Sequence, residues 1–146
     1  MTRVLLDTNV VVRLTDPGAP EHALVTEALD NLIARDALVC VTPQVLIEFW
    51  AVATRPLDAN GLGWSLEQTR EAVQGLVDQM VLLEDTAGVF AAWLDLASAG
   101  VSGKRVHDAR IVAVALAHSV ESILTLNTKD FAGFSGVEVV HPRDVT

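Results

Sequence analysis

Four acidic side chains stand at widely separated points of this 146-residue chain, each beside or within an apolar segment. Asp7 and Asp130 follow short apolar runs, whereas Glu48 and Asp108 fall in segments whose apolar spacing predicts helices. The four His residues lack zinc-site spacing, and hard oxygen ligands of this kind suit Mg²⁺ or Mn²⁺. Bound ions of that type can lower the pKa of a water molecule and neutralise the oxygens of a phosphodiester.

Each carboxylate also has a purely structural interpretation. Asp7 could be only a helix N-cap, Asp108 could only complement a helix dipole, and Asp130 could be a turn residue. Glu48 is harder to explain in this way, because its neighbours three and four positions away are mostly apolar and no Lys or Arg lies within one helical turn. A carboxylate on such a face is costly to bury without a partner, so Glu48 favours a functional site.

The elements that must position these acids alternate between strands and helices. The expected strands are Val4–Leu6, Ala37–Val41, Val81–Leu83, Ser122–Leu126 and, on a weaker pattern, Val137–Val140. The expected helices cover residues 8–16, 20–35, 43–54, 66–80, 86–99 and 106–118. This alternation predicts an α/β fold with three α/β/α layers around a central, mainly parallel sheet of four to five strands.

A parallel sheet brings the carboxyl ends of its strands to one edge, where crossover helices also begin. Asp7 and Asp130 follow strands, and Asp108 lies in the first turn of its helix. Glu48 lies in the helix that Thr42 and Pro43 are suited to start. We therefore expect the four carboxylates to meet at one edge of the sheet.

The composition indicates a folded protein with a hydrophobic core. The hydrophobic fraction is 51%, and the mean hydropathy is +0.39. The single Cys, Cys40, lies in an apolar run and is expected to be a buried hydrophobe. No signal peptide is evident, and no apolar run approaches the ~20 residues that span a bilayer, so we expect one cytoplasmic domain over residues 1–146 with no membrane contact. The net charge of −9 argues against loose nucleic-acid binding through a basic face and suits a basic partner.

Four short motifs resemble those of PIN domains, in the same order and over essentially the whole chain. They are Val4-Leu5-Leu6-Asp7-Thr8-Asn9, Val45-Leu46-Ile47-Glu48, Val106-His107-Asp108-Ala109-Arg110-Ile111 and Leu124-Thr125-Leu126-Asn127-Thr128-Lys129-Asp130-Phe131. Each motif alone is weak, since an Asp after a strand is common. All four in order on an α/β pattern are specific, and their spacing resembles that of VapC-like toxins of bacterial toxin–antitoxin pairs.

The resemblance implies a PIN fold and Mg²⁺-dependent endoribonuclease activity, with Mn²⁺ as a substitute. The implied acidic quartet is Asp7, Glu48, Asp108 and Asp130. Thr8 and Asn9 would support the site by hydrogen bonding. Many PIN domains carry an acid where Asn127 stands, so Asp130 would supply the fourth carboxylate and Asn127 would be an outer ligand.

The resemblance also implies a VapB-like antitoxin whose basic tail enters the acidic site, an RNA substrate, and a homodimer that forms a heterotetramer or larger assembly with the antitoxin. Three aromatic residues could serve the dimer or the antitoxin groove, with core packing as the alternative: Trp50, Trp64 and Trp93. Three basic residues flank two motif acids and could contact RNA phosphates, with a solvated charged face as the alternative: Lys104, Arg105 and Lys129.

Two other functions fit parts of the pattern. A haloacid-dehalogenase-like phosphatase would need a second Asp two residues after the first, where this chain has Asn9. A PIN-like RNA-binding or scaffold module without catalysis would typically have lost some of the acids, and here the set is complete.

Overall fold

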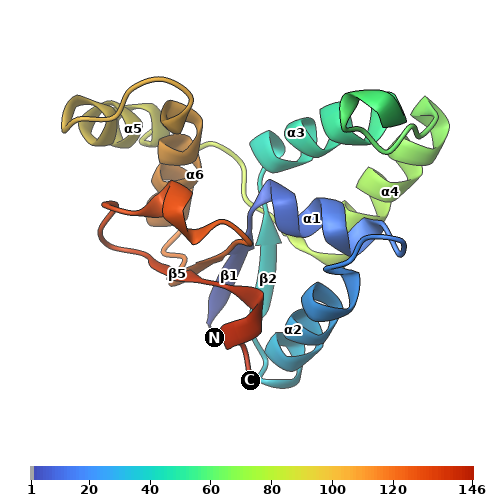
Figure 1. Cartoon of the computed structure of the whole chain (residues 1–146). Helices are drawn as coiled ribbons and strands as arrows, with labels where there is room; N and C mark the ends of the chain where they lie inside the picture. The colour runs from blue at the N-terminus through green and yellow to red at the C-terminus, as the bar shows by residue number, and fades with distance from the viewer. Residues whose placement is uncertain (1) are drawn as a thin grey trace.

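The computed structural model describes residues 2–146, which form a five-stranded sheet with helices on both faces (Figure 1). The strand order is β3-β2-β1-β4-β5, and all four neighbouring pairs are parallel. The strands are β1 (Arg3–Leu6), β2 (Leu38–Val41), β3 (Val81–Leu82), β4 (Ser122–Leu124) and β5 (Glu138–Val140). The expected three-layer α/β/α fold is confirmed.

All six expected helices are present. They are α1 (Thr8–Thr15), α2 (His22–Ala34), α3 (Pro43–Thr54), α4 (Leu66–Gln79), α5 (Val89–Ser98) and α6 (Arg105–Ala117). Three short 3₁₀ helices were not predicted: η1 (Leu57–Ala59), η2 (Thr128–Phe131) and η3 (Pro142–Asp144). Figure 1 shows α1 to α4 on one side of the sheet and α5 and α6 on the other.

Local sequence signals fix where the site-bearing helix α3 starts and stops. The Thr42 hydroxyl accepts a hydrogen bond from the backbone N–H of Val45 at 3.2 Å, and Pro43 occupies the first helical position. Arg55 leaves the helix in an extended conformation, as expected for the residue before Pro56. The N-cap at Thr42 therefore fixes the position of Glu48 within α3.

The sheet changes direction between β1 and β4. The chain proceeds from β1 outward to β2 and β3, then returns across the other face to place β4 beside β1. The backbone N–H of Asp7 donates to the carbonyl of Leu124 at 2.9 Å, which continues the β1–β4 contact past the ends of the strands. Crevices at such switch points are where open α/β sheets bind ligands.

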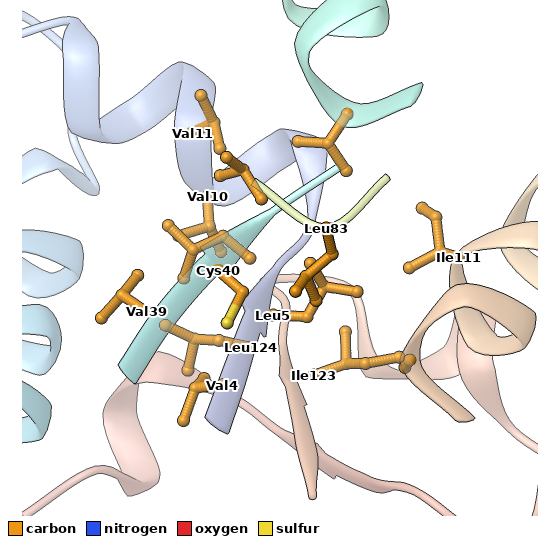
Figure 2. Packing of buried hydrophobic residues seen from close by; sticks show 14 of the residues in the cluster. Val4, Leu5, Val10, Val11, Val39, Cys40, Leu83, Ile111, Ile123 and Leu124 are labelled. Carbon is orange, nitrogen blue, oxygen red and sulfur yellow. The ribbon is translucent and has the colours of Figure 1, made fainter. Parts of the chain in front are cut away.

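The central strands and the helices around them form one hydrophobic core. Figure 2 shows Ile123 of the sheet directed toward Ile111 of α6, and Leu124 on the opposite face near Val4 and Val39. Cys40 is fully buried among these apolar side chains, as predicted. In residues 2–146, no helix has the length and apolar character that crossing a bilayer requires.

The three Trp residues have different surroundings. Trp64 packs edge-on against the buried Phe49 with ring centroids 6.0 Å apart. Trp93 stacks on Phe90 and donates its indole N–H to a carbonyl of α6, that of Val106, at 2.8 Å. Trp50 lines a shallow apolar surface of α3. Core packing thus accounts for Trp64, whereas the surfaces around Trp50 and Trp93 remain open to partners.

Candidate active site

A pocket of about 360 Å³ opens at the carboxyl edge of the sheet. The four predicted carboxylates all line it, although they come from the end of β1, from α3, from α6 and from η2: Asp7, Glu48, Asp108 and Asp130. Residues separated by more than 100 positions in sequence therefore face one space, and the negative charge concentrated there needs a counter-charge.

Asp7 is the most deeply held of the four, with only 6% of its surface exposed. Its Oδ1 accepts the backbone N–H of Thr8 at 2.8 Å, which makes Asp7 the N-cap of α1. Its Oδ2 accepts the hydroxyl of Thr125 at 2.7 Å and the side-chain amide of Asn9 at 3.2 Å. Burial raises the pKa of Asp7, and the nearby Glu48 and Asp130 raise it further, whereas the bonds from Thr125 and Thr8 lower it. The structural interpretation of Asp7 as an N-cap is thus confirmed, and its place in the pocket is compatible with the functional one.

Thr125 is a site residue that the sequence reasoning missed. It lies one residue past β4 and is fully buried. Besides donating to Asp7, its hydroxyl oxygen accepts from the side chain of Asn9 at 3.2 Å and from the backbone N–H of Asn127 at 3.0 Å. A hydroxyl directly after a strand at the switch point was the available signal, but Thr is also an ordinary strand residue.

Asn9 joins the ends of β1 and β4. Its side-chain oxygen accepts the backbone N–H of Leu126 at 3.0 Å, while its amide group contacts Asp7 and Thr125. The supporting hydrogen bonds expected of Asn9 are therefore present. Thr8 has a different place, because its hydroxyl donates to Oε1 of Glu48 at 3.1 Å and so connects α1 to α3.

Asp108 lies in the first turn of α6, where burial and nearby negative charges disfavour its ionised form. Burial, followed by the charges of Asp130, Asp7 and Glu48, raises its pKa from 3.8 to about 6, and Arg105 only partly opposes this rise. Carboxylates that share a confined space disfavour one another's charged form, and a bound cation would reverse the effect.

Asp130 and Asn127 belong to the same turn but do different things. Asp130 lines the pocket, whereas Asn127 does not and instead donates its amide to Oδ2 of Asp130 at 2.9 Å. Asp130 is thus the fourth carboxylate that lines the pocket, and Asn127 contacts the pocket acids through its hydrogen bond to Asp130. The helix η2, which contains Asp130 and begins directly after Asn127, is too short to be seen as a periodic pattern.

None of the three predicted RNA contacts lines this pocket: Lys104, Arg105 and Lys129. All three are exposed near the motif acids. Arg105 is already engaged, because it donates to the carbonyl of Ala132 at 2.7 Å and lies over the ring of Phe134, 5.3 Å from its centroid. Their contact with RNA stays a prediction.

Two other arginines line the pocket and were missed: Arg13 and Arg55. Arg13 lies four residues after Asn9 on α1, so helical periodicity could have placed it on the site face, whereas Arg55 lies just past the end of α3 and has no such signal. Arg13 is also paired with Glu21 at 3.0 Å. Cations at the rim of an acidic pocket are suited to hold the phosphates of a polyanion near a metal site.

The donor set fits a hard divalent cation. The side-chain groups of the pocket offer carboxylate, hydroxyl and amide oxygens and no thiolate or imidazole, which is the ligand chemistry of Mg²⁺ and Mn²⁺. Within residues 2–146, no three His, Cys, Asp or Glu side chains are already arranged to hold an ion.

The raised pKa of Asp108 predicts that Asp108→Asn stabilises the metal-free protein at neutral pH. A folded-state pKa of about 6 against the usual 3.8 means that the folded protein binds the proton more tightly than the unfolded chain. Stability is therefore lost as pH rises between these two values, and the cost is complete above the higher one. Because the group is partly solvated, we expect a gain on the order of 1 kcal/mol in free energy of unfolding.

Denaturant unfolding in EDTA would measure this gain. The difference in free energy of unfolding between Asp108→Asn and the parent should shrink as the pH falls from about 6 toward 3.8. The control is Asp95→Asn, which replaces an exposed Asp on α5 and should show no such trend. A variant that is less stable than the parent at neutral pH would show that the ionised Asp108 carboxylate is favourably held.

Comparisons with known proteins agree with this fold. The family model for the PIN domain matches residues 4–136. The relative "Ribonuclease VapC24" of Mycobacterium tuberculosis is 26% identical over 143 residues, which cover 94% of each chain. VapC20 of Mycobacterium tuberculosis, described as a sarcin-ricin loop cleaving toxin, superposes with a TM-score of 0.67 at 19% identity, covering 92% of this chain and 98% of that one. VapBC2 of Rickettsia felis, solved with a promoter DNA fragment, superposes with a TM-score of 0.69 at 16% identity, covering 96% of this chain and 98% of that one.

Proposed function

Since this chain belongs to the PIN domain family, we propose that it is an endoribonuclease that hydrolyses RNA phosphodiester bonds with the help of Mg²⁺ or Mn²⁺. The observation that supports this most directly is the meeting of four carboxylates in one pocket at the switch point of the sheet. The ribonuclease name of the VapC24 relative supports the same activity.

We assign separate roles to the residues of the pocket. Asp7, Asp108 and Asp130 would hold the cation directly or through water, and Glu48 would hold it or orient the attacking water. When bound, the cation lowers the pKa of a bound water and stabilises the developing charge on the phosphate oxygens. Asn9 and Thr125 keep the Asp7 carboxylate directed toward the pocket by their hydrogen bonds, and Asn127 does the same for Asp130. Arg13 and Arg55 would attract the RNA backbone.

We further propose that the chain is a single-domain toxin of a VapBC-type pair. The similar structures from Rickettsia felis and Klebsiella pneumoniae are described as VapBC2 and as a toxin–antitoxin complex, which supports a VapB-like partner. A homodimer within a larger complex belongs to the same proposal. The net charge of −9 and the acidic pocket favour an antitoxin tail with basic side chains. The whole range 1–146 would act as one cytoplasmic unit.

The family match removes support for a haloacid-dehalogenase-like phosphatase. A non-catalytic PIN-like scaffold is the remaining alternative, and the complete carboxylate set argues against it. A nuclease needs these acids to be charged and cation-bound, whereas a scaffold gains nothing from the cost of keeping them together.

Expression of the protein without a partner should arrest bacterial growth. Free ribonuclease activity damages cellular RNA, so induction should stop growth and fragment RNA, and an Asp108→Asn chain expressed to the same soluble level should do neither. Growth curves and RNA gels from the two strains measure this directly. Unaffected growth at high soluble expression of the parent would contradict the toxin role, while cleavage of purified RNA would still test the nuclease separately.

A further inference from the structure

Gln44 is an almost fully buried polar residue in the first turn of α3, with 6% of its surface exposed. Its side-chain amide donates to the backbone carbonyl of His107 at 2.8 Å and approaches Oε1 of Glu48 at 3.5 Å. His107 directly precedes Asp108. The Gln44 amide therefore contacts the backbone next to Asp108 and the side chain of Glu48.

The orientation of this amide is fixed by its partners. If the group were turned over, its oxygen would face the His107 carbonyl and the Glu48 carboxylate, which are both acceptors. In the observed orientation Oε1 of Gln44 has no hydrogen-bond partner, and it is the one buried side-chain polar atom in residues 2–146 with none. A buried acceptor left unpaired costs about 1–3 kcal/mol. The presence of Gln44 is thus poorly explained by stability.

We propose that Gln44 is a positioning residue of the active site, which holds α3 against the start of α6 and orients the Glu48 carboxylate toward the pocket. Glu48 then receives donors from two sides, the Thr8 hydroxyl at 3.1 Å from α1 and the Gln44 amide from its own helix. This inference rests on the proposed metal-dependent nuclease function.

The residue type suits this role. A Lys or Arg at position 44 would bring donors but would also neutralise Glu48 and compete with a cation for the carboxylate. A carboxylic acid at position 44 would add a further negative charge to the cluster. A neutral amide gives directed donors and leaves the charge of the pocket available for the cation, in the way that outer hydrogen bonds orient metal ligands elsewhere.

The test compares Gln44→Met with Thr69→Val. Met is unbranched and of similar length, so it keeps the helix and fills the space without donors. Thr69 is also fully buried and donates to a carbonyl, that of Ser65, at 2.8 Å, but it lies on α4 and does not line the pocket. Gln44→Leu, which is also neutral and without donors, serves as a second variant if Gln44→Met does not fold.

Three measurements separate positioning from mere support: Mn²⁺ affinity by calorimetry, kcat and KM on RNA, and the thermal midpoint in EDTA. We expect Gln44→Met to lower the Mn²⁺ affinity and the kcat by about 10–100-fold each. Its KM should change little, and its thermal midpoint should fall less than that of Thr69→Val, because removal of the unpaired acceptor offsets the loss of the His107 bond. Thr69→Val should lower the midpoint and leave Mn²⁺ affinity and kcat unchanged.

Either of two results would overturn the inference. Gln44→Met could keep the Mn²⁺ affinity and kcat of the parent, or it could lose both together with a fall in thermal midpoint at least as large as that of Thr69→Val. A parent protein that neither binds Mn²⁺ nor cleaves RNA would instead refute the proposed function, and the role of Gln44 would fall with it.

Discussion

Asp7→Asn and Asp108→Asn should each reduce RNA cleavage by about a thousandfold or more, equivalent to about 4 kcal/mol of lost transition-state stabilisation. Each substitution removes a negative oxygen from the pocket, and an amide is a much weaker ligand for a hard cation. The comparison is a single-turnover cleavage assay with saturating Mg²⁺.

The fold should survive both substitutions. Asn is as good an N-cap as Asp, so the bond that starts α1 at position 7 can be kept. With the side-chain oxygen kept at the N-cap, the new amide faces Thr125 and Asn9, so the Thr125 bond is lost and a modest loss of stability is expected at position 7. Circular dichroism should therefore be unchanged, and the exposed Asp95→Asn should cleave as the parent does. A fully active Asp108→Asn protein would remove that residue from the site.

Removal of divalent cations should abolish cleavage, and Mg²⁺ or Mn²⁺ should restore it. The pocket offers no thiol, imidazole or activated hydroxyl to act in place of a cation-assembled site. Activity that persists in excess chelator would refute the proposed chemistry.

The same cation should also change stability, with a sign that depends on the carboxylates. A ligand that binds only the folded state stabilises it by about 2.7 kcal/mol at one hundred times its dissociation constant. Mg²⁺ should therefore raise the thermal midpoint of the parent. In EDTA, Asp108→Asn should have the higher thermal midpoint. Mg²⁺ should raise the midpoint of Asp108→Asn far less than that of the parent, so the difference between the two midpoints should narrow or reverse when the metal is added. Equal gains in the two proteins would place the ion elsewhere.

The features of the fold that could be predicted from the sequence are those set by local patterns. The buried strand before Asp7 and the capped start of α3 at Thr42 each have a short-range cause, and parallel topology then brings their ends to one edge. For the same reason Glu48 could be singled out, because an acid on an apolar helix face is visible without coordinates.

The parts that could not be predicted depend on long-range hydrogen bonds. Thr125 was expected inside a strand that continued to Leu126, but β4 ends at Leu124 and the Thr125 hydroxyl binds Asp7, 118 positions away. Gln44 was seen only as a neighbour of Glu48, since nothing in its surroundings reveals that its amide reaches the backbone of α6. These contacts exist only once distant elements have packed.

The placement of β4 beside β1 has a consequence for biosynthesis. The Asp7 side chain takes a donor from Thr125, and the fourth acid is at position 130, so a nascent chain that has not yet released this stretch from the ribosome lacks both. Under the proposed function, a chain made from the N-terminus would therefore gain activity only once its last strands have docked. Under the proposed function, an antitoxin would need to capture only the finished enzyme and never the growing one.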